Sequence, residues 1–249
     1  INVGWAAGPA LGGYLASFLP YAMLFGFASV LSIGTAFVAF GLKESISQKN
    51  NKTDFAGMAR VRRDRSFVLF IFLNLVVFLA MGQMMSTMSL SMVDRIGFST
   101  AQYGLLLTLN GLIVILLQYP VAQNIDRFKK SRGLVTGCLL YSAGYLLFGW
   151  VGSYTLALIG MLILTLGEIS FAPAAMSVVG EIAPKGQKGR YMGFFGLNQV
   201  VGISLAPLFG GILLDVFATD ALPVWVIIAA CPFIGAFIFI WWAQKFKIS

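Results

Sequence analysis

The chain has 249 residues, of which 59% are hydrophobic and 10% are charged, and it carries a net charge of +8. Its mean hydropathy of +0.87 excludes a soluble globular protein, because a domain of this size needs far more polar surface. It contains no histidine, no cluster of metal-ligand residues and no phosphate-binding glycine loop, so we expect neither an enzyme nor a protein that needs a cofactor or metal.

Eight apolar segments are long enough to cross a bilayer as helices, which takes about 17 to 25 residues each. The sequence therefore predicts an all-α polytopic membrane protein, with helices near 1–19, 22–41, 67–93, 101–122, 134–153, 156–183, 191–217 and 222–243. The first segment begins without a methionine, a charged flank or a capping residue. We expect the chain to open inside a helix and to lack an N-terminal part.

The first and seventh segments carry the same motif of small residues. Gly4-x-x-x-Gly8-Pro9-x-x-Gly12-Gly13 matches Gly202-x-x-x-Ala206-Pro207-x-x-Gly210-Gly211. Small residues at this spacing let helix backbones approach closely, and a proline bends a spanning helix. We expect these residues to shape hinges and helix packing rather than to touch substrate. Internal repeats of this kind are typical of transporters.

The basic residues lie almost entirely on alternate connections between the segments. Of the 17, only Arg95 lies on the other set; the rest are Lys43, Lys49, Lys52, Arg60, Arg62, Arg63, Arg65, Arg127, Lys129, Lys130, Arg132, Lys185, Lys188, Arg190, Lys245 and Lys247. The positive-inside rule places these connections and the C-terminus in the cytoplasm, with the chain in the cell membrane. Because the charge is spread over short loops, we expect no nucleic-acid partner.

The connection 43–66 is the longest in the chain and separates two helices from six. Its part 53–63 is amphipathic, which predicts a short helix lying on the inner leaflet. A solvated linker fits the composition equally well.

The third segment carries a stripe of methionines beside Gln83, namely Met81, Met84, Met85, Met88 and Met92. Methionine can remould around dissimilar apolar molecules, so Met84 and Met88, together with Gln83, are candidates for lining a polyspecific pocket. A stripe at helical spacing is more often simple packing. The same two interpretations apply to Phe171, and the buried amides of Asn110 and Asn198 either line a cavity or tie helices together.

Glu168 is the deepest charge in the chain. It lies about 18 Å into the sixth segment at 1.5 Å per residue, near the middle of the bilayer, and no basic residue lies at that depth. Burial without a partner favours the neutral acid, and a carboxyl that alternates between its two forms is what proton coupling needs. The alternatives are a permanently protonated acid or one paired with a cation elsewhere. Pro173, one turn later, predicts a bend beside it.

Two motifs resemble the major facilitator superfamily. The first glycine motif is similar to the antiporter motif on the fifth helix of its drug/proton antiporter branch. The stretch Ala122-x-x-x-Asp126-Arg127-Phe128-Lys129-Lys130-Ser131-Arg132 resembles the signature loop between helices eight and nine, with Ala122 where the family has glycine. The resemblance implies helices five to twelve of twelve. The last two helices of the N-terminal bundle would be 1–42, the linker 43–66, and the C-terminal six-helix bundle 67–249.

The resemblance also implies a function. We expect a monomeric secondary transporter that exports small hydrophobic compounds against protons by alternating access, with Glu168 as the coupling residue. Charges at the cytoplasmic helix ends would form a latch or merely set the topology; these are Asp126, Arg127, Glu181 and Arg190. A metabolite, sugar or peptide porter of the same fold, a channel, and a membrane sensor or scaffold without transport remain alternatives.

Overall fold

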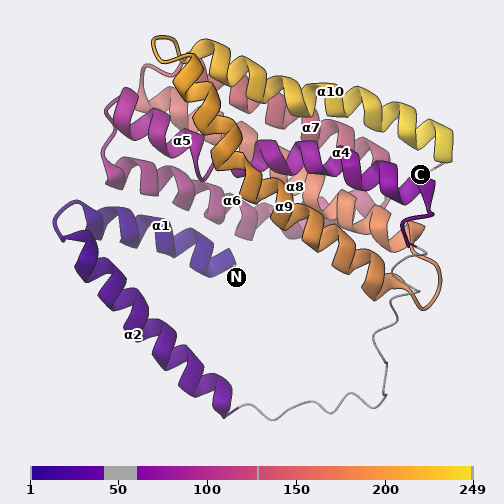
Figure 1. The fold of residues 1–249 in the computed structure, drawn as a ribbon, viewed down its shortest axis with the longest axis horizontal. Helices are drawn as coiled ribbons and strands as arrows, with labels where there is room; N and C mark the ends of the chain where they lie inside the picture. The colour runs from indigo at the N-terminus through magenta and orange to yellow at the C-terminus, as the bar shows by residue number, and fades with distance from the viewer. Residues whose placement is uncertain (1, 42–60, 128, 248–249) are drawn as a thin grey trace.

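The computed structural model describes residues 2–41, 61–127 and 129–247, and within these ranges the chain is built of helices joined by short turns (Figure 1). The helices are α1 (Asn2–Ala16), α2 (Tyr21–Phe40), α4 (Arg65–Gly82), α5 (Thr87–Leu90), the π-helix η1 (Ser91–Arg95), α6 (Thr100–Arg127), α7 (Lys130–Phe148), α8 (Tyr154–Ile182), α9 (Lys188–Val216) and α10 (Leu222–Phe246). The predicted all-α fold is confirmed.

Six helical segments of the described chain are long and apolar enough to cross a membrane. They are Tyr21–Phe40, Arg65–Arg95, Thr100–Gln123, Tyr154–Ile182, Lys188–Val216 and Leu222–Phe246. The two other predicted spans are α1, for which 15 residues are described, and α7, whose first turn is basic. Both nevertheless pack into the bundle, α1 along α6 and α7 between α8 and α10.

The third predicted segment is not one continuous helix. α4 ends at Gly82, a turn follows, and the chain resumes as α5 and the π-helix. The buried amide of Gln83 explains the break: its Nε2 donates to the carbonyl oxygens of Leu79, at 2.9 Å, and of Ala206 in α9, at 3.1 Å, while its Oε1 accepts from the Thr87 hydroxyl. The predicted span over 67–93 is therefore present, as Arg65–Arg95, but its helix is interrupted after Gly82.

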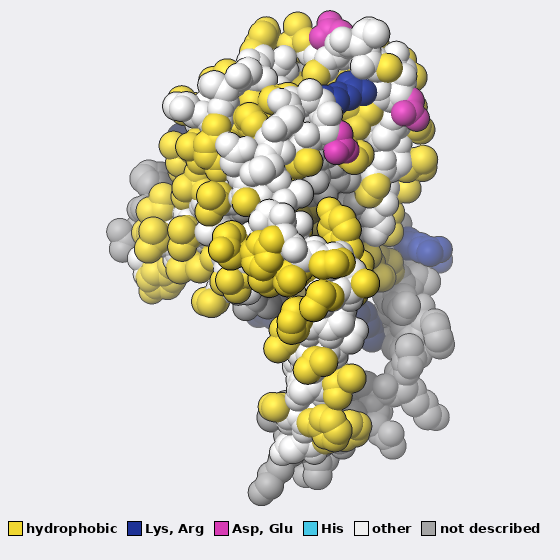
Figure 2. All heavy atoms as spheres, turned by 90° about the vertical axis from the view of Figure 1, so that its left-hand side faces the viewer, with side chains coloured by type: hydrophobic (Ala, Val, Ile, Leu, Met, Phe, Trp, Pro, Cys, Tyr) yellow, Lys and Arg dark blue, Asp and Glu magenta, His cyan; other side chains and the backbone are white. Residues whose placement is uncertain are grey.

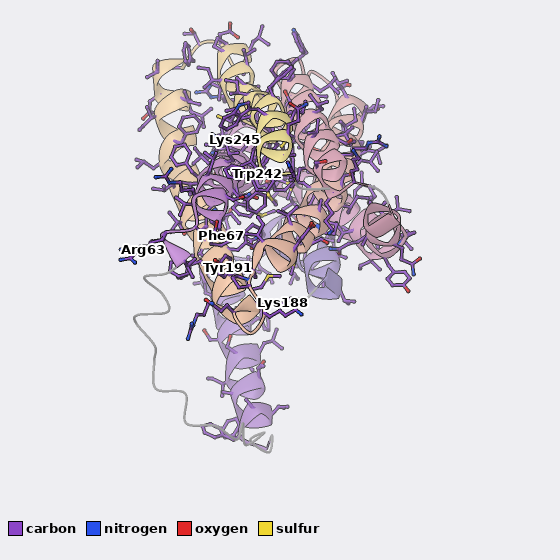
Figure 3. The ribbon with its side chains drawn as sticks, turned by 90° about the vertical axis from the view of Figure 1, so that its right-hand side faces the viewer. Arg63, Phe67, Lys188, Tyr191, Trp242 and Lys245 are labelled. Atoms are coloured by element: carbon purple, nitrogen blue, oxygen red, sulfur yellow. The ribbon has the colours of Figure 1, made fainter. Side chains whose placement is uncertain are left out.

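The start of α4 is fixed by contacts from α9 and α10. The Asp64 carboxylate caps α4 by accepting from the Phe67 backbone N–H at 3.1 Å, and it also accepts from the Tyr191 hydroxyl at 3.0 Å. Figure 3 shows Phe67 and Tyr191 side by side, with ring centroids 4.4 Å apart, and Trp242 close by. The indole N–H of Trp242 donates to the Ser66 carbonyl at 3.1 Å. Three helices, α4, α9 and α10, thus meet at the start of α4.

α2 slants away from the rest of the molecule (Figure 1) and buries none of its residues. Its exposed side chains include Phe25, Val30, Leu31, Phe37 and Phe40. Figure 2 shows hydrophobic side chains over much of the face turned to the viewer, with the acidic side chains near its upper end. A helix this apolar and this exposed needs lipid or further protein around it.

The two copies of the glycine motif pack through different faces. In α1, a Cβ on Gly13 would lie 2.6 Å from the Thr100 carbonyl oxygen of α6, whereas Gly4, Gly8 and Gly12 have nothing within 4 Å. In α9 the situation is reversed. A Cβ on Gly202 would lie 2.6 Å from the Phe78 Cβ of α4, and one on Gly210 would overlap Thr87, whereas Gly211 is open.

Pro9, Pro173 and Pro207 all lie inside continuous helices, namely α1, α8 and α9. The division of the chain into two bundles and a linker stays a prediction. Most of the linker, including the short helix predicted within it, lies outside the described residues.

Arg95 closes the end of α9. Its guanidinium donates to the carbonyl oxygens of Leu214, at 2.6 Å, and Phe217, at 3.2 Å, so a positive charge meets the negative end of the helix dipole. We expect Arg95→Gln to cost about 1 kcal/mol of stability and to lower the melting temperature of the purified protein by roughly 2–4 °C. Arg62→Gln removes an exposed charge that makes no such contact and should leave it unchanged. Equal melting of both variants would show that the cap contributes nothing.

Candidate substrate and proton site

A cavity of about 270 Å³ lies where α4, α6, α8 and α9 meet. Its lining consists of Met81, Gly82, Met84, Met85, Asn110, Gly111, Val114, Glu168, Gln199 and Ile203. The end of α4 at Gly82 shapes one wall, because the following turn brings Met84 and Met85 to the cavity together with Met81. Flexible thioether side chains and an ionisable one therefore line the same small, partly open space.

Glu168 lies at the midpoint of the 29-residue α8 and is partly buried. The Asn110 amide of α6 donates to its Oε2 at 2.8 Å and to the Thr165 hydroxyl at 3.1 Å. Thr165 in turn donates to the Met161 carbonyl at 2.8 Å, which fixes its oxygen as the acceptor. Both hydrogens of the Asn110 amide are thus used, and one of them holds the carboxyl group in the cavity wall.

Glu168 makes no ion pair with any cation in the described part of the chain. A carboxyl group held by a neutral amide is free to gain or lose a proton without breaking a salt bridge. The arrangement can therefore load a proton beside a space large enough for part of a small molecule.

The structure brings together only some of the cavity residues predicted from the sequence. Met84 and Asn110 join Glu168 in the lining. Met88 and Phe171 are fully buried in the core instead, and Gln83 ties α4 to α9. Asn198 donates to the Ile71 carbonyl of α4 at 3.0 Å, away from the cavity.

Sequence reasoning missed Thr165, because a hydroxyl residue inside an apolar helix carries no signal of its own. Its contact with Asn110 becomes visible only when α6 and α8 are placed together. Gly111 was missed for a similar reason: a Cβ there would lie 2.5 Å from the Ala6 Cα, so it brings α1 up to the back of the cavity wall.

The predicted latch is described only in part. Glu181 forms an ion pair with Lys130 at 2.5 Å, which links the end of α8 to the start of α7. Lys130 was not among the predicted latch residues. The side chains of Asp126 and Arg127 lie outside the described part of the chain, and Arg190 stands at the start of α9. The latch stays a prediction.

Comparison with known proteins places the chain among membrane transporters. The model of the Major Facilitator Superfamily matches residues 70–245. The chain is 30% identical over 227 residues to the uncharacterized MFS-type transporter YttB of Bacillus subtilis, covering 89% of this chain and 57% of that protein. It is 28% identical over 196 residues to the multidrug resistance protein MdtH of Klebsiella pneumoniae, covering 78% of this chain and 48% of that protein.

Solved structures give the same fold. A POT family transporter in complex with 5-aminolevulinic acid superposes with a TM-score of 0.62 at 16% identity, covering 94% of this chain and 50% of that one. The peptide transporter POT, in complex with sulfate, superposes with a TM-score of 0.55 at 13% identity, covering 91% of this chain and 54% of that one. The chain thus spans about half the length of the proteins that it matches.

Proposed function

Because the chain belongs to the major facilitator superfamily, we propose that it functions in secondary transport, exporting small hydrophobic or amphipathic compounds in exchange for protons. The family consists of transporters, which confirms the expectation that the chain is not an enzyme. The coupling ion, the direction of transport, the monomeric state and the cytoplasmic position of the basic loops belong to this proposal.

The observation that carries the proposal is the cavity in which Glu168 faces Met81, Met84 and Met85. Substrate and proton would meet in one place, so that binding of one can alter the free energy of binding of the other. Thioether side chains adapt to ligands of different shape, which suits compounds that share only an apolar character. The similarity to a multidrug resistance protein points the same way.

In the proposed mechanism, the hydrogen bond from Asn110 of α6 to Glu168 changes in strength when Glu168 gains or loses a proton. A carboxylate accepts a stronger hydrogen bond than a neutral carboxylic acid does, so loss of the proton tightens the bond between α8 and α6. α6 packs on α1 through Gly104 and Gly111, where a side chain would collide with α1 backbone. A change at Glu168 can therefore be passed to the contact between α6 and α1.

A porter for metabolites or peptides is the second candidate, because Asn110, Gln199 and Glu168 add polar groups to the cavity lining. Polar solutes need several hydrogen-bonding partners, whereas the methionines supply none.

The test uses the purified full-length protein in proteoliposomes with an acidic interior. We expect a lipophilic cationic dye to accumulate inside as protons leave, and a protonophore to abolish the accumulation. Accumulation of a dipeptide or a sugar in place of the dye would establish the second candidate. Dye binding without accumulation would indicate a sensor. An ion conductance far faster than alternating access allows would indicate a channel.

A further inference from the structure

A groove of about 760 Å³ runs between the start of α7 and the end of α10. It shares no lining residue with the cavity around Glu168. One wall carries Arg132 and Val135 of α7 with Lys129, the residue that precedes this helix, and the other carries Ile240 and Gln244 of α10 with Lys247, the residue that follows it. Arg132 and Val135 are three residues apart and Ile240 and Gln244 are four apart, so each pair lies on one face of its helix. Two helix faces therefore open towards each other at this end.

The groove is strongly basic. Lys129, Arg132 and Lys247 contribute three positive charges, and no carboxylate is found among the described residues that line it. None of the three forms an ion pair with a carboxylate in the described part of the chain, since the ion pair nearest in sequence joins Lys130 to Glu181 on α8. Ser131 and Thr136 add hydroxyl groups to the same wall. The groove thus presents charge and hydrogen-bond donors that suit a phosphate group.

The groove continues onto apolar surface. Val135 and Ile240 line it, and the same helix faces continue with Leu139 and Phe237, which are 41% and 58% exposed. Beside it, the Lys245 ammonium lies 4.5 Å from the centroid of the Trp241 ring. Aromatic and basic residues paired at a helix end are typical of the boundary between hydrocarbon and headgroups. The charged end therefore lies at headgroup level and the apolar faces extend into the hydrocarbon.

From these observations we propose that the groove is a binding site for an anionic phospholipid. The three cations would hold the phosphate of the headgroup, and the acyl chains would run along Leu139 and Phe237. Basic pockets between transmembrane helices commonly hold anionic headgroups. A soluble phosphate would use the cations but leave the apolar faces uncovered, so the lipid fits the whole groove.

The test measures binding of phosphatidylglycerol and phosphatidylcholine to the detergent-purified full-length protein by native mass spectrometry. At about 5-fold per cation, we expect phosphatidylglycerol to bind about 100-fold more tightly. The combined variant Lys129→Gln, Arg132→Gln and Lys247→Gln should lose this preference. Arg62→Gln, Arg63→Gln and Lys185→Gln, which remove the same charge outside the groove, should keep it.

A second variant separates the groove from general attraction to a basic surface. Thr136→Trp keeps every charge but fills the space between the helices, and it should also weaken phosphatidylglycerol binding at least 10-fold. Unchanged binding in this variant, or an equal loss in the control triple variant, would overturn the proposal. Displacement of the lipid by inorganic phosphate at constant ionic strength would assign the site to a soluble anion instead. Melting curves of each variant verify that it is folded.

Discussion

Replacing Glu168 by glutamine is expected to reduce dye accumulation driven by a proton gradient to the level of protein-free liposomes. Glutamine has the same shape as the protonated acid, and its side-chain oxygen can still accept from Asn110, which now lies 2.8 Å from the carboxyl oxygen. It cannot release a proton. The variant therefore keeps the geometry of the cavity while removing the chemical step that links substrate movement to the gradient.

Two further measurements make this prediction sharp. Dye binding to Glu168→Gln, followed by tryptophan fluorescence, should stay within about 3-fold of the unmodified protein, because the apolar lining is intact. Asp215→Asn makes the same chemical change at the exposed end of α9 and should transport normally. Unimpaired gradient-driven accumulation in Glu168→Gln would remove Glu168 from the coupling role, whereas loss of dye binding would make it a substrate ligand instead.

The helical segments could be predicted from the sequence because a bilayer imposes a length and a composition that few other structures share. The site was partly predictable for a related reason. Glu168 stands out as a charge in the middle of an apolar segment, and its position at the midpoint of α8 agrees with that interpretation. Its partner Asn110 could be named as a buried amide, but nothing in the sequence tells which helix it faces.

The turn after α4 shows why the remainder was out of reach. A run of apolar residues predicts one helix through 67–93, yet the Gln83 amide bonds to Ala206, a residue more than a hundred positions away. That contact depends on how α9 packs, which local sequence does not encode. This turn after Gly82 decides which methionines face the cavity. Met84 does, whereas Met88, one helical turn further in a straight helix, is buried in the core.

The second large effect is expected on stability, where α7 and α8 approach each other closely. A Cβ placed on Gly137 would lie 2.6 Å from the Phe171 Cβ, 2.8 Å from the Phe171 backbone nitrogen and 2.9 Å from the Gly167 oxygen. One placed on Gly167 would lie 2.9 Å from the Tyr141 backbone nitrogen. Backbone atoms cannot rotate away as a side chain can, so the two helices would have to separate.

Gly137→Ala should therefore destabilise the purified protein by about 1–3 kcal/mol, although alanine is intrinsically the better helix former. The matched control is Gly180→Ala on α8, where the added Cβ would meet only the Met192 Cε at an ordinary 3.8 Å. This variant should melt at the same temperature as the unmodified protein or slightly higher. Melting of Gly137→Ala at the temperature of Gly180→Ala would mean that α7 and α8 lie further apart. The position of Glu168 relative to the cavity would then be less tightly fixed, because its neighbour Gly167 lies in the contact between α7 and α8.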